Sequence, residues 1–304
     1  MATITESVAD TSGFIPQAWA LEALNVLRNN VVLARIVTMD KDYAPGWQGK
    51  TLNIPYPGTF TAQDKTAGNP ITAQAPTGGA TVSLNLAKHK TVDMMVEDFA
   101  AAQSNSDLLN RYIQPAIIAL AEQVENDLFS LYSSLTGTSV GTAGTDLTST
   151  VVRTAAKNLD VALAPTQDRW LVISAKDKTA LLGDTNLATF YAYSDPEAIK
   201  AGNLPNLYGF NVAMSQLVPA VAGTPVSTKN LAFHKSAIMM AMRPFMPITP
   251  GTGVATATAV DPESGIAIRV LKQYDINYRA THLAFDILYG FVALRPNQGL
   301  VALA

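Results

Sequence analysis

The sequence predicts an α+β fold, and three observations lead to that prediction. Apolar residues recur at helical spacing from Ser104 to Leu135, whereas residues 80–86 alternate apolar and polar side chains as a strand does. Beyond residue 150, helical and strand-like segments follow one another without a fixed repeat. A chain of 304 residues that mixes both periods in this way predicts about two folding units.

The composition excludes several classes of protein. Hydrophobic residues make up 48% of the chain, which is too many for a disordered protein. Charged residues make up only 15%, against about 25% in an ordinary soluble domain, and the net charge is −3. This balance provides no basic field for nucleic acid. The absence of cysteine excludes disulfides, thiolate metal sites and cysteine nucleophiles.

The N-terminal sequence has neither the basic nor the apolar region of a secretory signal. No apolar run approaches the roughly 18 residues that a membrane-spanning helix needs. We therefore expect a soluble protein that is made in a cytoplasm and does not enter a membrane.

The first ninety residues predict a helix, an extended segment and a hairpin. An amphipathic helix is expected over residues 17–30, and the β-branched run Val31–Val37 favours an extended backbone. Residues 50–88 predict two long strands joined by a polar excursion, because residues 59–77 hold few large apolar side chains. A two-stranded ribbon is marginal alone in water. It needs support either from its own body or from another chain.

The segment Ser104–Leu135 predicts a long helix of roughly 45 Å that acts as a structural spine. Pro115 lies inside it and is expected to kink the helix or to mark a restart. Three acids near its C-terminal end, Glu122, Glu125 and Asp127, are expected on its solvated face.

A Gly/Thr/Ser-rich loop at 137–150 is the predicted internal boundary. After it we expect helices at 151–164 and 175–182, strands at 169–173 and 208–214, and a loop at 249–258. A terminal run of strands is expected at 265–271, 274–280 and 284–294.

Catalytic signals are weak. Gly137-Thr-Ser139-Val-Gly141 matches the pattern of a serine nucleophile elbow, but that motif needs a strand before the serine and a helix directly after it. His89, His234 and His282 have no partner at metal-ligand spacing. The sequence therefore predicts no enzyme, no cofactor and no metal, and a hydrolase using Ser139 stays as an alternative of another class. The low charge is consistent either with interfaces, which exclude charge from their centres, or with a neutral soluble surface.

The order of the segments resembles the major capsid (coat) protein family of tailed bacteriophages, which has the Hong Kong 97-type fold. The phrases that carry the resemblance are Leu33–Val37, Gly49–Pro55, Val82–Val92, Met94–Asp98, Leu207–Ser215, Ala232–Ala237 and Tyr289–Pro296. Together they extend over nearly the whole chain. No catalytic signature contributes to the resemblance.

This resemblance implies a division into four parts. Residues 1–44 would form an N-arm and residues 45–90 an extended β-ribbon loop. A peripheral domain with the spine helix would combine residues 91–136 and 262–304, and residues 137–261 would form an axial domain with connecting loops. The implied assembly interface lies on the ribbon and in the axial domain; its residues are Trp47, Phe60, Asp64, Lys65, Val82, Leu84, Tyr191 and Tyr193.

The implied function is self-assembly of pentamers and hexamers into an icosahedral head shell around double-stranded DNA, which the wall contacts non-specifically. The expected location is the virion, after synthesis in the bacterial cytoplasm, and scaffolding, portal and decoration proteins are the expected partners. Some relatives cross-link a lysine to an asparagine, but Lys65 carries no distinctive signal of this and we expect no cross-link. A bacterial encapsulin, which shares the fold but encloses enzyme cargo, is the nearest alternative.

Overall fold

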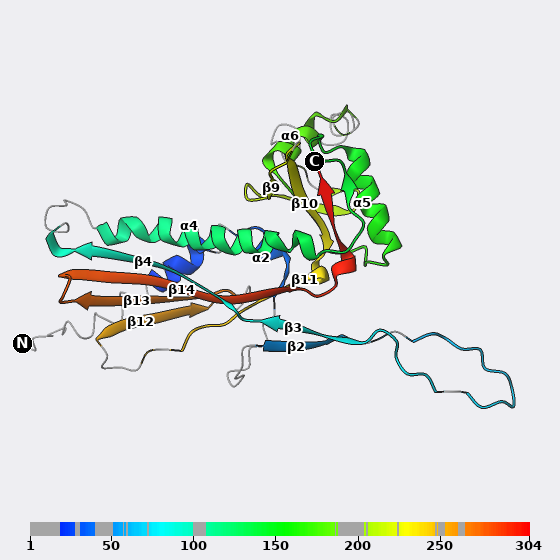
Figure 1. Ribbon diagram of the computed structural model, residues 1–304, viewed down its shortest axis with the longest axis horizontal. Helices are drawn as coiled ribbons and strands as arrows, with labels where there is room; N and C mark the ends of the chain where they lie inside the picture. Colours follow the sequence, from blue (N-terminus) through cyan, green and yellow to red (C-terminus); the bar gives the residue numbers. More distant parts are fainter. Residues whose placement is uncertain are drawn as a thin grey trace, which may run out of the picture.

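The computed structural model describes residues 19–27, 31–39, 51–99, 108–187, 204–248, 253–260 and 265–304, except positions 57, 59, 72, 186, 205, 224 and 247. In this part of the chain, two sheets form two bodies, and a thin hairpin extends well beyond both (Figure 1). The predicted α+β class is confirmed.

The first sheet is built around β14, Ala280–Ala293, which pairs antiparallel with β4, β11 and β13. Two further strands complete it, since β12 pairs with β13 and β1 pairs with β11. The bounds of these strands are Thr38–Met39 for β1, Lys88–Glu97 for β4, Ile238–Met242 for β11, Val254–Val260 for β12 and Ala267–Asp275 for β13.

The spine helix is α4, Leu108–Phe129, and it continues as the 3-10 turn η1, Ser130–Ser134. It lies along one face of the first sheet (Figure 1). Its apolar residues Ile113, Ile117, Leu120 and Val124 join one buried cluster with alternate residues of β14. The helix passes through Pro115 without ending, and its 22 residues span about 33 Å; positions 104–107 of the predicted helix lie outside the described residues.

The second sheet has the order β5-β15-β10-β6-β8-β7, with β9 paired to β10. The bounds are Val140–Gly141 for β5, Arg169–Ile173 for β6, Asn206–Leu207 for β7, Phe210–Met214 for β8, Ala220–Val221 for β9, Ser227–His234 for β10 and Gly299–Leu303 for β15. Helices α5, Ser149–Val161, and α6, Ala175–Gly183, pack against it and share its separate apolar core.

The hairpin consists of β2, Thr51–Tyr56, and β3, Ala80–Asn85, in antiparallel register over six residue pairs. Two strands were predicted here, but each is short, and the 23 positions from 57 to 79 lie between them. Two 3-10 turns, η2 (Lys235–Ala237) and η3 (Pro296–Gln298), lie where the chain passes between the two sheets.

Three further predictions of secondary structure are wrong. Val31–Val37 is not extended, because residues 33–36 form the short helix α2, Leu33–Ile36. The stretch predicted as a loop at 249–258 contains most of β12, whose Thr- and Ala-rich sequence is held by seven residue pairs with β13. The strand predicted at 274–280 is largely a turn, in which Arg279 has φ +48°.

Membership of the two sheets does not follow the predicted segments at three strands. β11 and β12 were assigned to the axial domain, yet both belong to the first sheet, which is the sheet that the spine helix covers. β15 was assigned to the peripheral domain, yet it lies between β5 and β10 in the second sheet. Strand pairing joins residues distant in sequence, so sheet membership need not follow segments of the chain, and the division into four parts stays a prediction.

Candidate assembly surface

The hairpin is held together by cross-strand contacts of small polar side chains as well as by its backbone. Thr51 donates its hydroxyl to the Asn85 side-chain oxygen at 2.7 Å, and Ser83 donates to the Asn53 side-chain oxygen at 2.8 Å. The opposite face of the hairpin carries Leu52, which pairs directly with Leu84. One face is therefore polar and solvated, and the other is apolar and needs cover.

The base of the hairpin finds that cover on its own chain. Leu84 and Leu86 are buried with Ala241 of β11 in a small separate core. The contact is so close that a Cβ atom at Gly290 of β14 would overlap the Asn85 carbonyl oxygen. The predicted interface residue Leu84 is fully buried in the subunit, so its side chain is not available to a neighbour. This corrects the expectation that Leu84 lies in the assembly interface, and it shows that the base of the ribbon takes its support from its own body.

The far part of the hairpin has no such cover. The described positions from 60 to 79 are all exposed, and they form the long loop that extends away from both sheets in Figure 1. Phe60 is 69% exposed and Ile71 is 62% exposed, which leaves two large apolar side chains in water. The loop therefore extends into solvent without cover from its own subunit.

The other predicted interface residues lie at different places. Asp64 and Lys65 are exposed on the loop, and Val82 is half-buried in β3. Lys65 donates from Nζ to the carbonyl oxygens of Thr66, at 3.0 Å, and of Asn69. Trp47, Tyr191 and Tyr193 lie outside the described residues.

A buried carboxylate ties the N-terminal segment to the spine helix. Glu125 Oε1 accepts hydrogen bonds from the backbone N–H groups of Val32 (3.1 Å) and Ala34 (3.0 Å), and Oε2 accepts one from Leu33 (3.0 Å). These are the N–H groups that a helix start leaves without partners. Burial raises the pKa of Glu125, and the three backbone hydrogen bonds oppose that rise. Glu125 is buried. The expectation that it lies on the solvated face of the helix is therefore wrong.

Asp127 makes the corresponding tie between the spine helix and the first sheet. It accepts a hydrogen bond from the Tyr289 hydroxyl at 2.6 Å and pairs with Lys88 Nζ at 2.9 Å. Burial raises the pKa of Asp127, but the hydrogen bonds from Tyr289 and Lys88 outweigh it and leave the pKa below its ordinary value. Of the three acids predicted on the solvated face, Glu122 alone is exposed.

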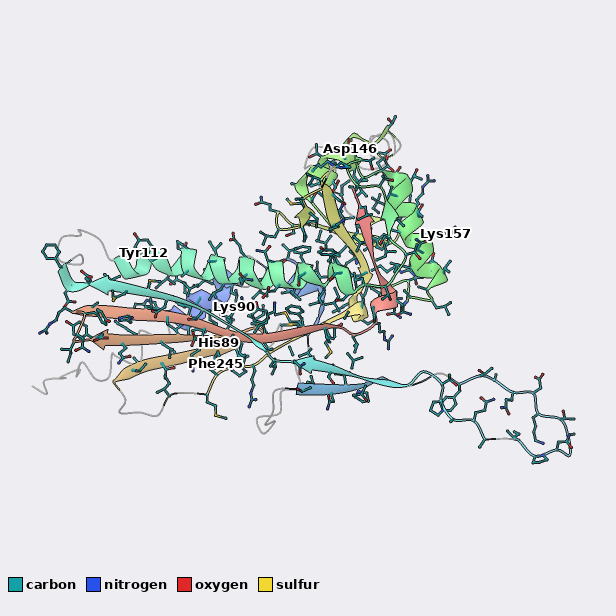
Figure 2. All side chains as sticks on the ribbon, in the orientation of Figure 1. His89, Lys90, Tyr112, Asp146, Lys157 and Phe245 are labelled. Atoms are coloured by element: carbon teal, nitrogen blue, oxygen red, sulfur yellow. The ribbon has the colours of Figure 1, made fainter. Side chains whose placement is uncertain are left out.

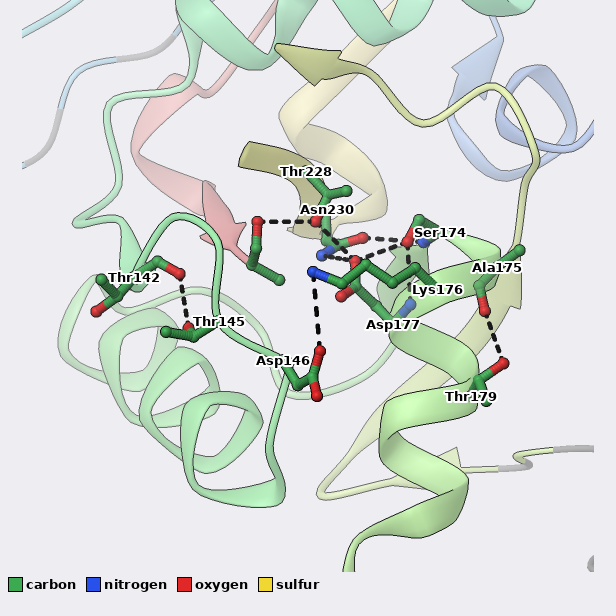
Figure 3. A network of polar contacts seen from close by, with 11 residues as sticks. Thr142, Thr145, Asp146, Ser174, Ala175, Lys176, Asp177, Thr179, Thr228 and Asn230 are labelled. Carbon is green, nitrogen blue, oxygen red and sulfur yellow. Dashed lines mark hydrogen bonds and ion pairs between the residues drawn. The ribbon is translucent and has the colours of Figure 1, made fainter. Parts of the chain in front are cut away.

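A polar network fixes the second sheet from inside (Figure 3). Asp177 is fully buried, and its Oδ2 accepts hydrogen bonds from Ser174 Oγ (2.7 Å), Thr228 Oγ1 (2.8 Å) and Asn230 Nδ2 (2.7 Å). Thr228 also donates its backbone N–H to the Ala304 carbonyl oxygen at 2.8 Å. The network joins α6, β10 and the end of the chain into one rigid unit, so its role is structural.

The motifs considered for catalysis are not assembled into a site. Ser139 is exposed in a short loop before the two-residue strand β5, and α5 begins only at Ser149, so the strand and following helix of a nucleophile elbow are missing. Among the described residues, no group of three His, Asp or Glu side chains could hold a metal ion. No described helix has both the length and the apolar character needed to cross a membrane.

Comparison with known proteins identifies the family of folds. A sequence profile described as phage capsid protein matches residues 132–244, and one described as the P22 coat protein, gene protein 5, matches residues 211–303. No curated protein sequence matches the chain.

Solved structures match over most of the chain. A protein of Mycobacterium phage Che8 is 21% identical with a TM-score of 0.68, and the match covers 90% of both chains. The capsid of cyanophage P-SCSP1u gives 16% identity and a TM-score of 0.65, covering 90% of this chain and 87% of that one. An encapsulin of Synechococcus elongatus gives 12% identity and a TM-score of 0.51, covering 89% and 85%. The predicted Hong Kong 97-type capsid fold is confirmed.

Proposed function

We propose that this chain, which has the fold of tailed-phage capsid proteins, is a major capsid protein whose copies assemble into the icosahedral shell of a phage head. The observation that carries the proposal is the hairpin loop at 60–79, which is anchored at its base yet exposed along its length. The loop adds no residue to the apolar cores of its own subunit. It gains cover when it lies on the next copy.

The proposed mechanism is head-to-tail association. The loop of one copy and the surface it covers on the next are different patches, so the contact is heterologous and can close into rings of five or six. The connections between the two sheets are short, such as η2 between β10 and β11. Small rotations at these connections would let identical chains fit pentamers and hexamers.

The contents of the shell are proposed to be double-stranded DNA held without sequence recognition. The chain carries a net charge of −3, so phosphate neutralisation contributes little to wall contacts. We also propose that the shell assembles in the bacterial cytoplasm and that scaffolding, portal and decoration proteins take part. The protein acts by assembly and is not an enzyme.

An encapsulin-type compartment is the second candidate, because the fold match extends to the encapsulin of Synechococcus elongatus. The two candidates make shells with different contents. DNA in purified particles supports the phage head, whereas a protein cargo supports the compartment.

The test is to express the chain in bacteria and to examine the product by sedimentation and electron microscopy. Closed particles of megadalton mass are expected. A product that stays a 32 kDa monomer, both alone and with its neighbouring phage proteins supplied, would contradict the proposal.

A further inference from the structure

Strand β12 forms an outer edge of the first sheet. Figure 1 shows it on the side of the sheet opposite to β4, with β13 as its neighbour. All seven of its residues pair with β13, and among the described residues no other backbone group hydrogen-bonds to it. One of the two rows of N–H and C=O groups on β12 therefore has no partner within the described part of the subunit.

The chain between β11 and β12 does not cover this edge where the structure describes it. Phe245 lies on the face of the sheet, and the centre of its ring is 4.8 Å from that of His89 on β4 (Figure 2). The same ring lies 4.1 Å from the guanidinium carbon of Arg269 on β13. Ile248 lines a groove on that face together with Leu271. The described part of this segment thus covers the face and leaves the edge of β12 open.

The outer strands β4 and β12 differ in charge. The charged residues of the ten-residue strand β4 are Lys88, Lys90, Asp93 and Glu97. Charges of this kind keep an edge strand from pairing with another chain. β12 has no charged residue and no proline, since its sequence is Val-Ala-Thr-Ala-Thr-Ala-Val. The edge at β12 is therefore open to pairing with a further strand.

The sequence of β12 reads the same in both directions. Its ends are Val254 and Val260, its centre is Ala257, and the residues between them follow the same order from either end. When two copies pair antiparallel about this centre, each residue lies opposite a residue of its own type. Thr256 of one copy then lies opposite Thr258 of the other, and facing threonines stabilise an antiparallel pair. The strand that β12 matches best is therefore a second β12.

This pairing also matches the two faces of the sheet. Two identical strands that pair antiparallel are related by a two-fold axis perpendicular to the sheet, so each face stays on its own side. Ala257 and Ala259 are buried in the core that α4 covers, and Thr256 and Thr258 lie on the opposite face. Two first sheets would thus join into one, with both spine helices on the same side.

We propose that β12 of one copy pairs antiparallel with β12 of a second copy, about a two-fold axis that passes between the two Ala257 residues. The contact is isologous, and it differs from the head-to-tail contact that closes the rings. An icosahedral shell has two-fold axes between its rings, and the strand pair suits such an axis. That placement rests on the proposed function, whereas the strand pair itself requires only two copies.

The direct test is disulfide mapping, which is simple here because the chain contains no cysteine. Thr256→Cys and Thr258→Cys subunits, one of them labelled with heavy nitrogen, are mixed, assembled and oxidised. In the proposed register, positions 256 and 258 of two copies face each other at about 5 Å between Cβ atoms, whereas identical positions lie about 7–8 Å apart. Mass spectrometry is therefore expected to find the mixed disulfide at least about fivefold more abundant than either disulfide between identical positions.

Thr154→Cys, at an exposed site on α5, is the matched control for disulfides that form by random collision. Mixed disulfide at no more than the level of this control would overturn the inference. Disulfides between identical positions that are as abundant as the mixed one would overturn it too, because they contradict the register.

Charge variants at the same two positions provide an independent test. Thr256→Lys combined with Thr258→Lys places like charges opposite each other, and it is expected to raise the protein concentration needed for assembly at least about tenfold. Thr256→Lys combined with Thr258→Glu places opposite charges face to face, and it is expected to assemble at nearly the wild-type concentration. Circular dichroism checks that both variants fold. Equal assembly of the two folded variants would overturn the inference.

The outcomes separate the two proposals. If wild-type protein forms particles but the mixed disulfide is not favoured in them, the pairing of β12 fails while the capsid function stands. If wild-type protein forms no particles with its phage partners present, the proposed function fails. The same disulfide mapping on concentrated subunits then decides the pairing: a dimer joined from 256 to 258 supports it, and the absence of this dimer overturns it.

Discussion

At the scale of single residues, buried polar groups hold the segments of this protein in place. Glu125 provides acceptors for the start of α2, and Asp127 links the spine helix to Tyr289 and Lys88 of the first sheet. Each carboxylate joins parts of the chain that are distant in sequence. Removing the Glu125 acceptor leaves buried backbone N–H donors without a partner, and removing Asp127 does the same to the hydroxyl of the buried Tyr289.

We expect Glu125→Gln to lower the free energy of unfolding by about 1–3 kcal/mol, because the amide NH₂ group would face backbone N–H donors. The measurement is denaturant unfolding of the unassembled subunit. Glu122→Gln, one turn earlier on the exposed face of α4, is the control and should change stability by no more than about 0.5 kcal/mol. Equal effects of the two substitutions would contradict the capping role.

The lowered pKa of Asp127 makes the stability of the subunit depend on pH. Its folded-state pKa is lowered, so its contribution to stability is complete above the ordinary pKa of an aspartate and is lost as the pH falls through the lowered value. Asp127→Asn should therefore reduce stability near neutral pH and flatten the loss of stability in acid. Thermal unfolding of both proteins between pH 3 and pH 7 measures this difference, and parallel curves would count against it.

At the scale of elements, the hairpin is a ribbon whose two ends behave differently. Its base is clamped to β11 and β14 by Leu84, Leu86 and the close approach at Gly290, whereas its tip has no cover within the subunit. Because the base of the hairpin is fixed, its exposed tip points in one direction. This lowers the entropy lost when the tip binds a partner.

We expect Gly290→Ala to loosen the base of the hairpin, because the added methyl group would overlap the Asn85 carbonyl oxygen. Hydrogen exchange of the amides at 80–86 should become faster, while amides of the second sheet keep their protection. Gly183→Ala is the matched control, since a Cβ atom there meets nothing within 4 Å. Unchanged exchange at 80–86 would show that the contact at Gly290 can relax without cost.

At the scale of the whole molecule, folding and assembly should be separable. The two large apolar cores lie within the two bodies, a small third core lies under the base of the hairpin, and the exposed loop contributes to none of them. The fold of one subunit therefore does not depend on the loop, and we propose that the loop acts between subunits.

Deleting residues 59–77 should leave the circular dichroism and thermal unfolding of the subunit close to those of the wild type. The same deletion should abolish particles in sedimentation and electron microscopy. The control is Lys157→Glu at an exposed site on α5, which should leave particle formation intact. A deletion of equal length within α4 would not be a suitable control, because it removes core residues. Particles of normal appearance from the loop deletion would contradict the role assigned to the hairpin.

Local sequence patterns determined the elements whose stability is local. The period of α4, the alternation in β3 and the buried run of β6 each follow from which side chains share a face, and the structure has all three. The exposed excursion between β2 and β3 was likewise predictable, because residues 59–77 offer little to bury.

Tertiary structure alone decided the features that depend on distant partners. The β-branched run at Val31 forms a helical turn because Glu125, more than ninety residues away, satisfies its N–H groups. The Thr- and Ala-rich β12 is a strand because β13 provides its hydrogen bonds, and β15 belongs to the second sheet because β10 lies beside it. Local propensity differs by only about 1 kcal/mol per residue, so a hydrogen-bonding partner brought close by the fold outweighs it.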